Sequence, residues 1–146
     1  MGYTRYFWRR LSKNKMEKSF DKWNEDKKKL NKSNSRFFLH EREVWWCSLG
    51  VNIGYEADGK NDKFIRPVLI LRIFGNGTCW ILPLTTKYKE GPYYQECFIG
   101  SSTTKSYIVL SQLRLISKKR IIKKMGMISK DDFAKVKEEI FNILGK

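Results

Sequence analysis

The amino-acid sequence predicts one mainly β domain with helices on both flanks, an α+β fold. Three observations predict it. The length of 146 residues suits a single domain with its own core. Both flanks carry apolar residues at helical spacing. Between them lie five short runs rich in aromatic and β-branched residues, as in strands: EVWWCSL, RPVLILRIF, TCWILPLTT, QECFIG and SYIVL.

Residues 1–40 form a basic arm ahead of the strands. The arm holds twelve Lys/Arg and four Asp/Glu, so it carries +8 of the formal net charge of +15. Helical spacing of its apolar residues predicts an amphipathic helix over about 14–30, packed on or tethered to the main domain. That apolar stripe consists of Met16, Phe20, Trp23 and Leu30. The segment NKSNS at 31–35 is typical of a linker, and the domain proper is expected over 41–146.

The turn and helix signals complete the secondary structure. Gly75-Asn76-Gly77 predicts a hairpin between the second and third runs, because Asn and Gly tolerate positive φ. Near the end, Ser117 can cap a short helix through KKRIIKKM that stops at Gly126. Ser129 and Asp132 form a capping box for a last helix. Its apolar positions are Phe133, Val136, Ile140 and Ile143, and Gly145 closes it.

The charge points to a polyanionic partner. A pI near 9.8 attracts nucleic acid, an anionic membrane surface or an acidic protein, unless it serves solubility alone. No apolar run approaches the roughly 20 residues of a spanning helix, so no membrane partner is expected. The start MGYTRYFWRR has charges where a signal peptide needs apolar residues. Three distant cysteines, Cys47, Cys79 and Cys97, are expected as buried free thiols of a cytoplasmic protein.

Common catalytic signatures are absent from the sequence. A single histidine, His40, excludes a ribonuclease mechanism that uses two histidines, and its place beside Glu41 and Arg42 suggests a surface residue. The chain has no GxxxxGK[ST], HExxH or GxSxG motif. The cysteines and His40 have no metal-ligand spacing, so neither a metal nor a cofactor is expected.

Five short elements over about residues 41–145 resemble, in order and spacing, the PemK/MazF family of toxins of type II toxin–antitoxin systems. They are Glu43-Val44-Trp45, Gly54-Tyr55-Glu56, Arg66-Pro67-Val68, Pro83-Leu84-Thr85-Thr86 and Gln112-Leu113-Arg114-Leu115-Ile116. The chain departs from the family in a longer loop between Gly59 and Arg66 and in the N-terminal arm.

The resemblance implies a compact, antiparallel, Src-homology-3-like barrel of the PemK/MazF/CcdB toxin type, with C-terminal helices. The strand runs agree with a small barrel, although alone they do not choose between a barrel and a sandwich. The resemblance also implies a homodimer with RNA along the subunit interface. Because the matched elements lie outside the arm, deletion of residues 1–38 is expected to leave catalysis largely intact. It is expected to weaken the affinity for RNA or antitoxin and to flatten the salt dependence of binding.

The implied activity is that of a metal-independent endoribonuclease, in which the 2′-hydroxyl of single-stranded RNA attacks the adjacent phosphate. The resemblance makes Arg66 and Thr85 the catalytic residues. An arginine offers a fork of donors to phosphate oxygens, and a threonine hydroxyl can donate to a phosphate or 2′-oxygen. How the two divide electrostatic stabilisation and proton transfer stays open at this point, since the guanidinium pKa is very high.

Six further residues are expected to bind RNA: Tyr55, Glu56, Phe64, Thr86, Gln112 and Arg114. For Glu56 the alternative is an ordinary turn residue, and for Gln112 a hydrogen bond within the fold. Tyr55 and Phe64 are expected to stack on bases from a mobile loop. Trp45, Trp46 and Trp80 can stack on bases too, but alternation along their strands sends at least half of them into the core.

An RNA-cutting toxin also implies a small acidic antitoxin as partner. Two rival functions are a gyrase poison of the CcdB type and an RNA-binding protein without cleavage. The first type ends in Trp-Gly-Ile, whereas this chain ends FNILGK. The presence of both Arg66 and Thr85 favours cleavage over binding alone.

Overall fold

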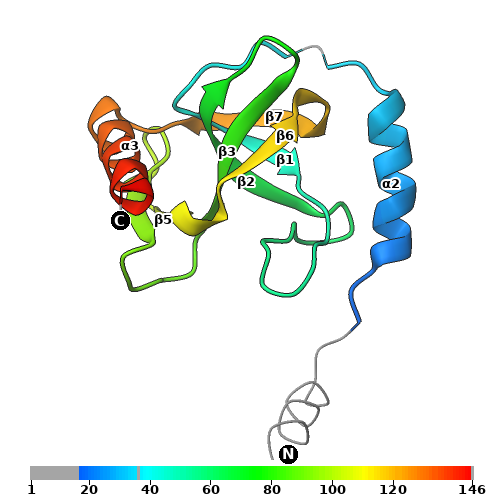
Figure 1. Cartoon of the computed structure of the whole chain (residues 1–146), viewed down its shortest axis with the longest axis horizontal. Helices are drawn as coiled ribbons and strands as arrows, with labels where there is room; N and C mark the ends of the chain where they lie inside the picture. The colour runs from blue at the N-terminus through cyan, green and yellow to red at the C-terminus, as the bar shows by residue number, and fades with distance from the viewer. Residues whose placement is uncertain (1–16, 36, 146) are drawn as a thin grey trace, which may run out of the picture.

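The computed structural model describes residues 17–35 and 37–145 and confirms the α+β class (Figure 1). In chain order the elements are α2 (Phe20–Lys32), β1 (Glu43–Ser48), β2 (Ile65–Ile73), β3 (Thr78–Thr85), β4 (Tyr94–Phe98), β5 (Lys105–Val109), η1 (Leu110–Gln112), β6 (Arg114–Ser117), η2 (Lys118–Arg120), β7 (Ile121–Met127) and α3 (Lys130–Leu144). All five strand runs expected from the sequence are strands.

The strands form one seven-stranded antiparallel sheet. Its order is β4-β5-β3-β2-β1-β7, and β6 pairs with β3 outside this path. Among the described residues, β4 and β7 at the two ends do not pair as strands, although the Gly100 N–H donates to the Met127 carbonyl (2.8 Å). The expected barrel is therefore an open sheet whose ends approach each other without closing.

Both faces of the sheet are buried, which explains the continuous apolar runs of β2 and β3. Along β2, Leu69 and Leu71 enter one core cluster, which α3 covers with Phe133 and Val136. The intervening residues of β2 enter a second cluster, which also holds Trp45. In Figure 1, α2 and α3 lie on opposite sides of the sheet.

The hairpin and the last helix are confirmed. Gly77 has φ +81, and the Phe74 N–H donates to the Thr78 carbonyl (2.9 Å) across the turn. At the start of α3 the Ser129 hydroxyl accepts from the Asp132 N–H (3.0 Å), as the capping signal predicts.

The helix expected through residues 118–125 is wrong. The Ser117 hydroxyl does accept from the Lys119 N–H (3.2 Å), but the helical turn ends at Arg120 and strand β7 follows. β7 supplies the second hydrogen-bonded neighbour of β1 and buries Ile121 in the core. Because satisfying the main chain of β1 matters more than the weak helix propensity of lysines, tertiary context decides this segment.

The helix expected over 14–30 is shifted. Residues 14–16 lie outside the described part of the chain, residues 17–19 are not helical, and α2 runs from Phe20 to Lys32. The helix therefore takes in the first two residues of the expected linker. Asp21 in the first turn and Lys29 and Lys32 in the last suit the helix dipole.

The three cysteines are free and buried, as expected. Burial raises the pKa of the Cys47 and Cys97 thiols to about 12 and that of Cys79 to about 11, so all three stay protonated at neutral pH. In the described part of the chain, none of the helices is long and apolar enough to cross a membrane.

Candidate functional site

Arg66 and Thr85 meet because two antiparallel strands bring their ends together. Arg66 lies at the start of β2 and Thr85 at the end of β3. The pairing of the two strands ends at Val68 and Pro83, and Arg66 and Thr85 each lie two residues beyond that pair. Both line one pocket of about 210 Å³. The sheet therefore brings together the two residues that the sequence suggests.

The Arg66 guanidinium is held by main-chain oxygens. Its Nε donates to the Asp58 carbonyl (2.6 Å), and Nη1 donates to the Leu84 carbonyl (3.5 Å). Burial lowers the pKa of Arg66, and the nearby negative charge of Asp58 opposes that shift. No ion pair involves Arg66 within the described residues, so its remaining N–H donors can serve a ligand.

The Thr85 hydroxyl is oriented by the turn that follows β3. Its oxygen accepts from the Lys87 N–H (3.2 Å), which leaves the hydroxyl hydrogen to donate elsewhere. Thr85 is half-buried at the pocket wall, whereas Thr86 beside it is exposed and also lines the pocket. Thr85 is thus the better fixed of the two donors.

The pocket is positively charged. Lys60 lies on its wall, and burial, together with the charges of Arg66 and Lys87, lowers the pKa of Lys60. None of the described lining residues is Asp or Glu, the ligands that Mg²⁺ prefers in proteins. Across the described part of the chain, no group of three or more His, Cys, Asp or Glu residues could hold a metal ion. Such a pocket suits an anion such as a phosphate group.

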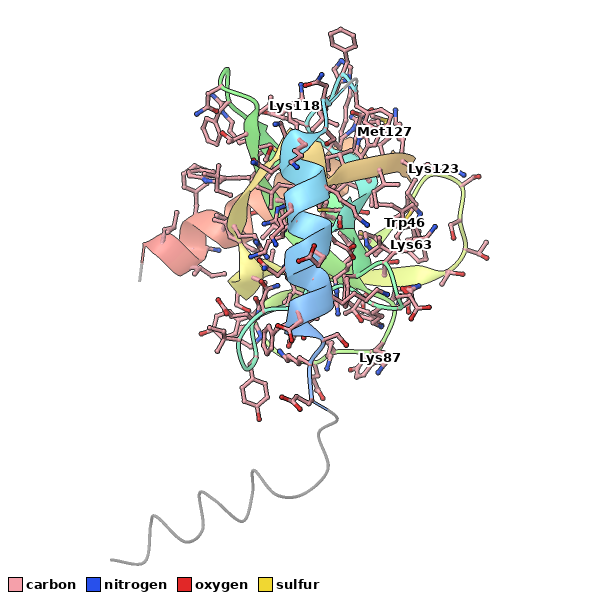
Figure 2. All side chains as sticks on the ribbon, turned by 90° about the vertical axis from the view of Figure 1, so that its right-hand side faces the viewer. Trp46, Lys63, Lys87, Lys118, Lys123 and Met127 are labelled. Atoms are coloured by element: carbon pink, nitrogen blue, oxygen red, sulfur yellow. The ribbon has the colours of Figure 1, made fainter. Side chains whose placement is uncertain are left out.

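One wall of the pocket is apolar and includes Trp46. This half-buried ring shares the pocket with the polar residues and with Ile99 and Met125. In the view of Figure 2, Trp46, Lys63, Lys87 and Lys123 lie on the same side of α2. A ring beside the cationic groups of the pocket can stack on a base.

A sequence pattern favours a role at the surface for one of Trp45 and Trp46, but no pattern predicts a role for Lys60. Alternation along EVWWCS requires Trp45 and Trp46 to face opposite ways, and Trp45 is buried. The sequence therefore indicates that one of the two leaves the core, without saying which. Nothing in the sequence singles out Lys60 among the other lysines.

The remaining candidates for RNA binding are spread around the pocket. Tyr55 is 92% exposed and Glu56 is exposed, and both lie outside the pocket lining. The Gln112 amide contacts their loop: its oxygen accepts from the Ala57 N–H (3.1 Å), and its nitrogen donates to the Tyr55 carbonyl (3.0 Å). Arg114 is half-buried on β6, opposite Ile81.

The structure contradicts the prediction for Phe64. The sequence predicts an exposed ring that stacks on bases from a mobile loop. In the structure Phe64 is 6% exposed and packs edge-on against Trp23, with ring centroids 5.7 Å apart. Helix α2 covers it, and sequence spacing could not show where the helix docks. The expectation of base stacking by Phe64 does not hold in this structure.

The fold and the pocket define a small β protein with a positively charged pocket at its strand ends. The model of one family, PemK-like, MazF-like toxins of type II toxin–antitoxin systems, matches residues 40–144. The chain belongs to that family.

Solved structures share the fold at low identity. MazF from Deinococcus radiodurans has a TM-score of 0.64 and 17% identity, over 75% of this chain and 99% of that one. An endoribonuclease in complex with its cognate antitoxin, from a mycobacterial species, has a TM-score of 0.56 and 16% identity, over 74% and 96%. A MazE–MazF complex from Deinococcus radiodurans has 0.57 and 15%, over 75% and 97%. No curated protein sequence matches the chain.

Proposed function

We propose that the protein is an endoribonuclease toxin that cuts single-stranded RNA without a metal ion. The observation that carries this proposal is the meeting of Arg66 and Thr85 in one pocket with a positive charge and an apolar wall. Family membership supports it, since the matched family consists of toxins.

In the proposed reaction the RNA supplies its own nucleophile. The 2′-oxygen attacks the adjacent phosphorus and loses its proton, while the bond from phosphorus to the 5′-oxygen breaks and that oxygen gains a proton. The products are a 2′,3′-cyclic phosphate and a 5′-hydroxyl. The protein must align the sugar and stabilise the charge that develops on the phosphate oxygens.

The pocket residues suit these tasks. Arg66 is fixed by two carbonyls and stays charged at neutral pH despite its lowered pKa, so it stabilises the developing charge. Thr85 donates its hydroxyl hydrogen to a phosphate or 2′-oxygen. Lys60 supplies a second cation at the wall.

An acidic antitoxin and a homodimer belong to the same proposal. Two of the similar solved structures are complexes, one with a cognate antitoxin and one of MazE with MazF. A chain of net charge +15 offers an acidic partner strong electrostatic attraction. Light scattering after size exclusion tests the dimer, and a mass near that of a monomer would contradict it.

The deciding experiment is cleavage of single-stranded RNA in EDTA. The purified protein is expected to cut RNA and to leave 2′,3′-cyclic phosphate or 3′-phosphate and 5′-hydroxyl ends, identified by mass spectrometry. DNA of the same sequence is the matched control and stays intact, because it lacks the 2′-hydroxyl. Cleavage of that DNA, or an absolute need for Mg²⁺, would overturn the mechanism.

A further inference from the structure

Helix α2 docks on the long loop that joins β1 to β2, residues 49–64. Trp23 of α2 is 4% exposed and packs on the Phe64 ring of this loop. Gly50 has φ +84, and a Cβ there would lie 2.0 Å from Cε2 of the Trp23 indole, so the Trp23 ring packs directly on the loop backbone. The Arg120 guanidinium lies 5.5 Å from the Trp23 ring and completes its surroundings. Figure 2 shows α2 lying across the front of the domain.

Two lysines of the arm hold the same loop. The Lys18 ammonium donates to the carbonyls of Asn52 (2.5 Å) and Gly54 (3.0 Å), and it forms an ion pair with Asp58 (2.9 Å). One turn further on, Lys22 donates to a carbonyl nearer the end of the loop, that of Asp62 (2.8 Å). The loop is therefore tied to the arm at four points besides the buried tryptophan.

The other side of this loop builds the candidate site. The Asp58 carbonyl accepts from Arg66 Nε, and Lys60 and Asn61 line the pocket. Asp58 thus receives Lys18 on its carboxylate and holds Arg66 with its carbonyl. A continuous series of contacts runs from the arm to the guanidinium, through one loop residue.

We propose that α2 and Lys18 form an intrachain clamp that fixes the 49–64 loop and, through it, positions Arg66 and Lys60 for cleavage. Lys18 and Trp23 are positioning residues, since neither lines the pocket. The inference rests on the proposed function. Its physical basis is the conformational entropy that a loop of this length loses when it becomes ordered. The docked helix holds the loop in an ordered conformation before substrate binds, so binding does not have to order it.

The clamp predicts that catalysis depends on the arm, which differs from the expectation based on the motifs. The matched elements lie outside residues 1–38, so the sequence suggests that catalysis does not need the arm. The contacts of Lys18 and Trp23 indicate instead that kcat depends on the arm.

The test uses single substitutions in the full chain. Lys18→Met removes the ammonium and keeps an apolar stem, whereas Lys18→Arg keeps a cation. Lys29→Met, at an exposed position of α2, is the matched control because it removes one positive charge from the same arm. Trp23→Ala and Trp23→Phe probe the docked face. For each variant, kcat and KM are measured on RNA in EDTA, hydrogen exchange is followed over residues 51–64, and circular dichroism checks folding.

Lys18→Met is expected to lower kcat about 10- to 100-fold, the scale of a small misplacement of a reacting group. Exchange in the loop becomes faster. Trp23→Ala acts in the same direction, Lys18→Arg and Trp23→Phe recover most of the rate, and Lys29→Met keeps the wild-type kcat.

The clamp would be overturned by unchanged loop exchange in Lys18→Met and Trp23→Ala, or by faster exchange with unchanged kcat. A loss of rate shared equally by Lys29→Met would overturn it too, because charge alone would then explain the loss. If the wild-type protein leaves RNA intact, the proposed function fails separately. The clamp is then tested by hydrogen exchange of the loop alone. Faster exchange in Lys18→Met and Trp23→Ala would support the clamp, and unchanged exchange would refute it.

Discussion

Thr85 and Thr86 are neighbours in the chain with different surroundings. Thr85 is half-buried with its oxygen engaged by the Lys87 N–H, and Thr86 is exposed. Thr85→Ala is therefore expected to lower kcat by about 10²-fold or more, the scale of losing one preorganised donor. Thr86→Ala, the matched control, is expected to have a smaller effect. Arg66→Ala is expected to abolish cleavage while circular dichroism stays native. Reversed effects of the two threonine variants would show that the reacting hydroxyl is Thr86.

Trp46 is the aromatic residue of the pocket wall. If its ring stacks on a base, Trp46→Ala removes that contact, and stacking on an aromatic side chain is worth about 1–3 kcal/mol per base. RNA affinity is expected to fall roughly 10-fold or more, and Trp46→Phe is expected to keep most of it. Trp80→Ala is the control, since Trp80 packs on Phe74 outside the pocket lining. Fluorescence anisotropy with an RNA carrying 2′-deoxy sugars measures binding without cleavage. Equal losses in the two alanine variants would contradict stacking at Trp46.

At the scale of residues, the sequence identifies only part of the site. Arg66 and Thr85 could be chosen as candidates because their motifs keep a fixed order, and both line the pocket. Lys60 could not, because its importance comes from the charges near it in space. Phe64 was assigned wrongly because its environment depends on Trp23, about forty positions earlier in the chain.

At the scale of elements, local patterns predict what local forces determine. The Ser129 cap and the apolar spacing of α3 are visible in the sequence, as is the hairpin at Gly75-Asn76-Gly77. β7 is different, because its conformation follows from pairing with β1, more than seventy residues earlier. The sheet order and the docking of α2 depend equally on distant contacts, which periodicity does not record.

Glu43 of β1 contacts β7 through Lys124, and its surroundings predict a pH dependence of stability. Its side chain is 3% exposed and accepts from the His40 N–H (2.5 Å) and from Trp45 Nε1 (3.4 Å), beside the Lys124 ammonium of β7 (2.5 Å). Burial would raise the pKa of Glu43, but the hydrogen bonds from Lys124, His40 and Trp45 lower it more, so its pKa lies below the ordinary value.

A lowered carboxylate pKa stabilises the fold above the unfolded pKa of about 4.3, and the gain is lost as pH falls through the lower folded pKa. Glu43→Gln is therefore expected to destabilise the protein by about 1–3 kcal/mol at pH 7. The difference in the free energy of unfolding between Glu43→Gln and the wild-type protein is expected to become smaller in acid. Urea unfolding at pH 7 and near pH 3 measures it, with Glu41→Gln, at a 42% exposed side chain, as control. A difference that stays constant with pH would refute the role of the charge.

For the whole molecule, the distribution of charge matters more than its total. Residues 1–40 carry +8 of the +15, yet the two arm lysines nearest the loop, Lys18 and Lys22, bind carbonyls and Asp58 within the chain. Part of the arm's charge is thus structural. The cations best placed for a polyanion are those of the pocket, Lys60, Arg66 and the neighbouring Lys87.

This distribution predicts how RNA affinity responds to salt. For a single strand, the slope of log K against log salt changes by about 0.7 for each phosphate contact. Lys60→Met is expected to flatten the slope by about that amount, whereas Lys135→Met, at an exposed position of α3 outside the pocket lining, is expected to leave it unchanged. Anisotropy with 2′-deoxy-substituted RNA from 50 to 200 mM salt measures both slopes.

An acidic antitoxin that occupies the same pocket would show the same dependence on Lys60, and a polyglutamate peptide is a direct probe. It is expected to compete with RNA at low salt and to bind Lys60→Met more weakly than Lys135→Met. Equal binding to both variants would show that the peptide binds away from the pocket. An acidic antitoxin would then be expected to bind away from the pocket as well.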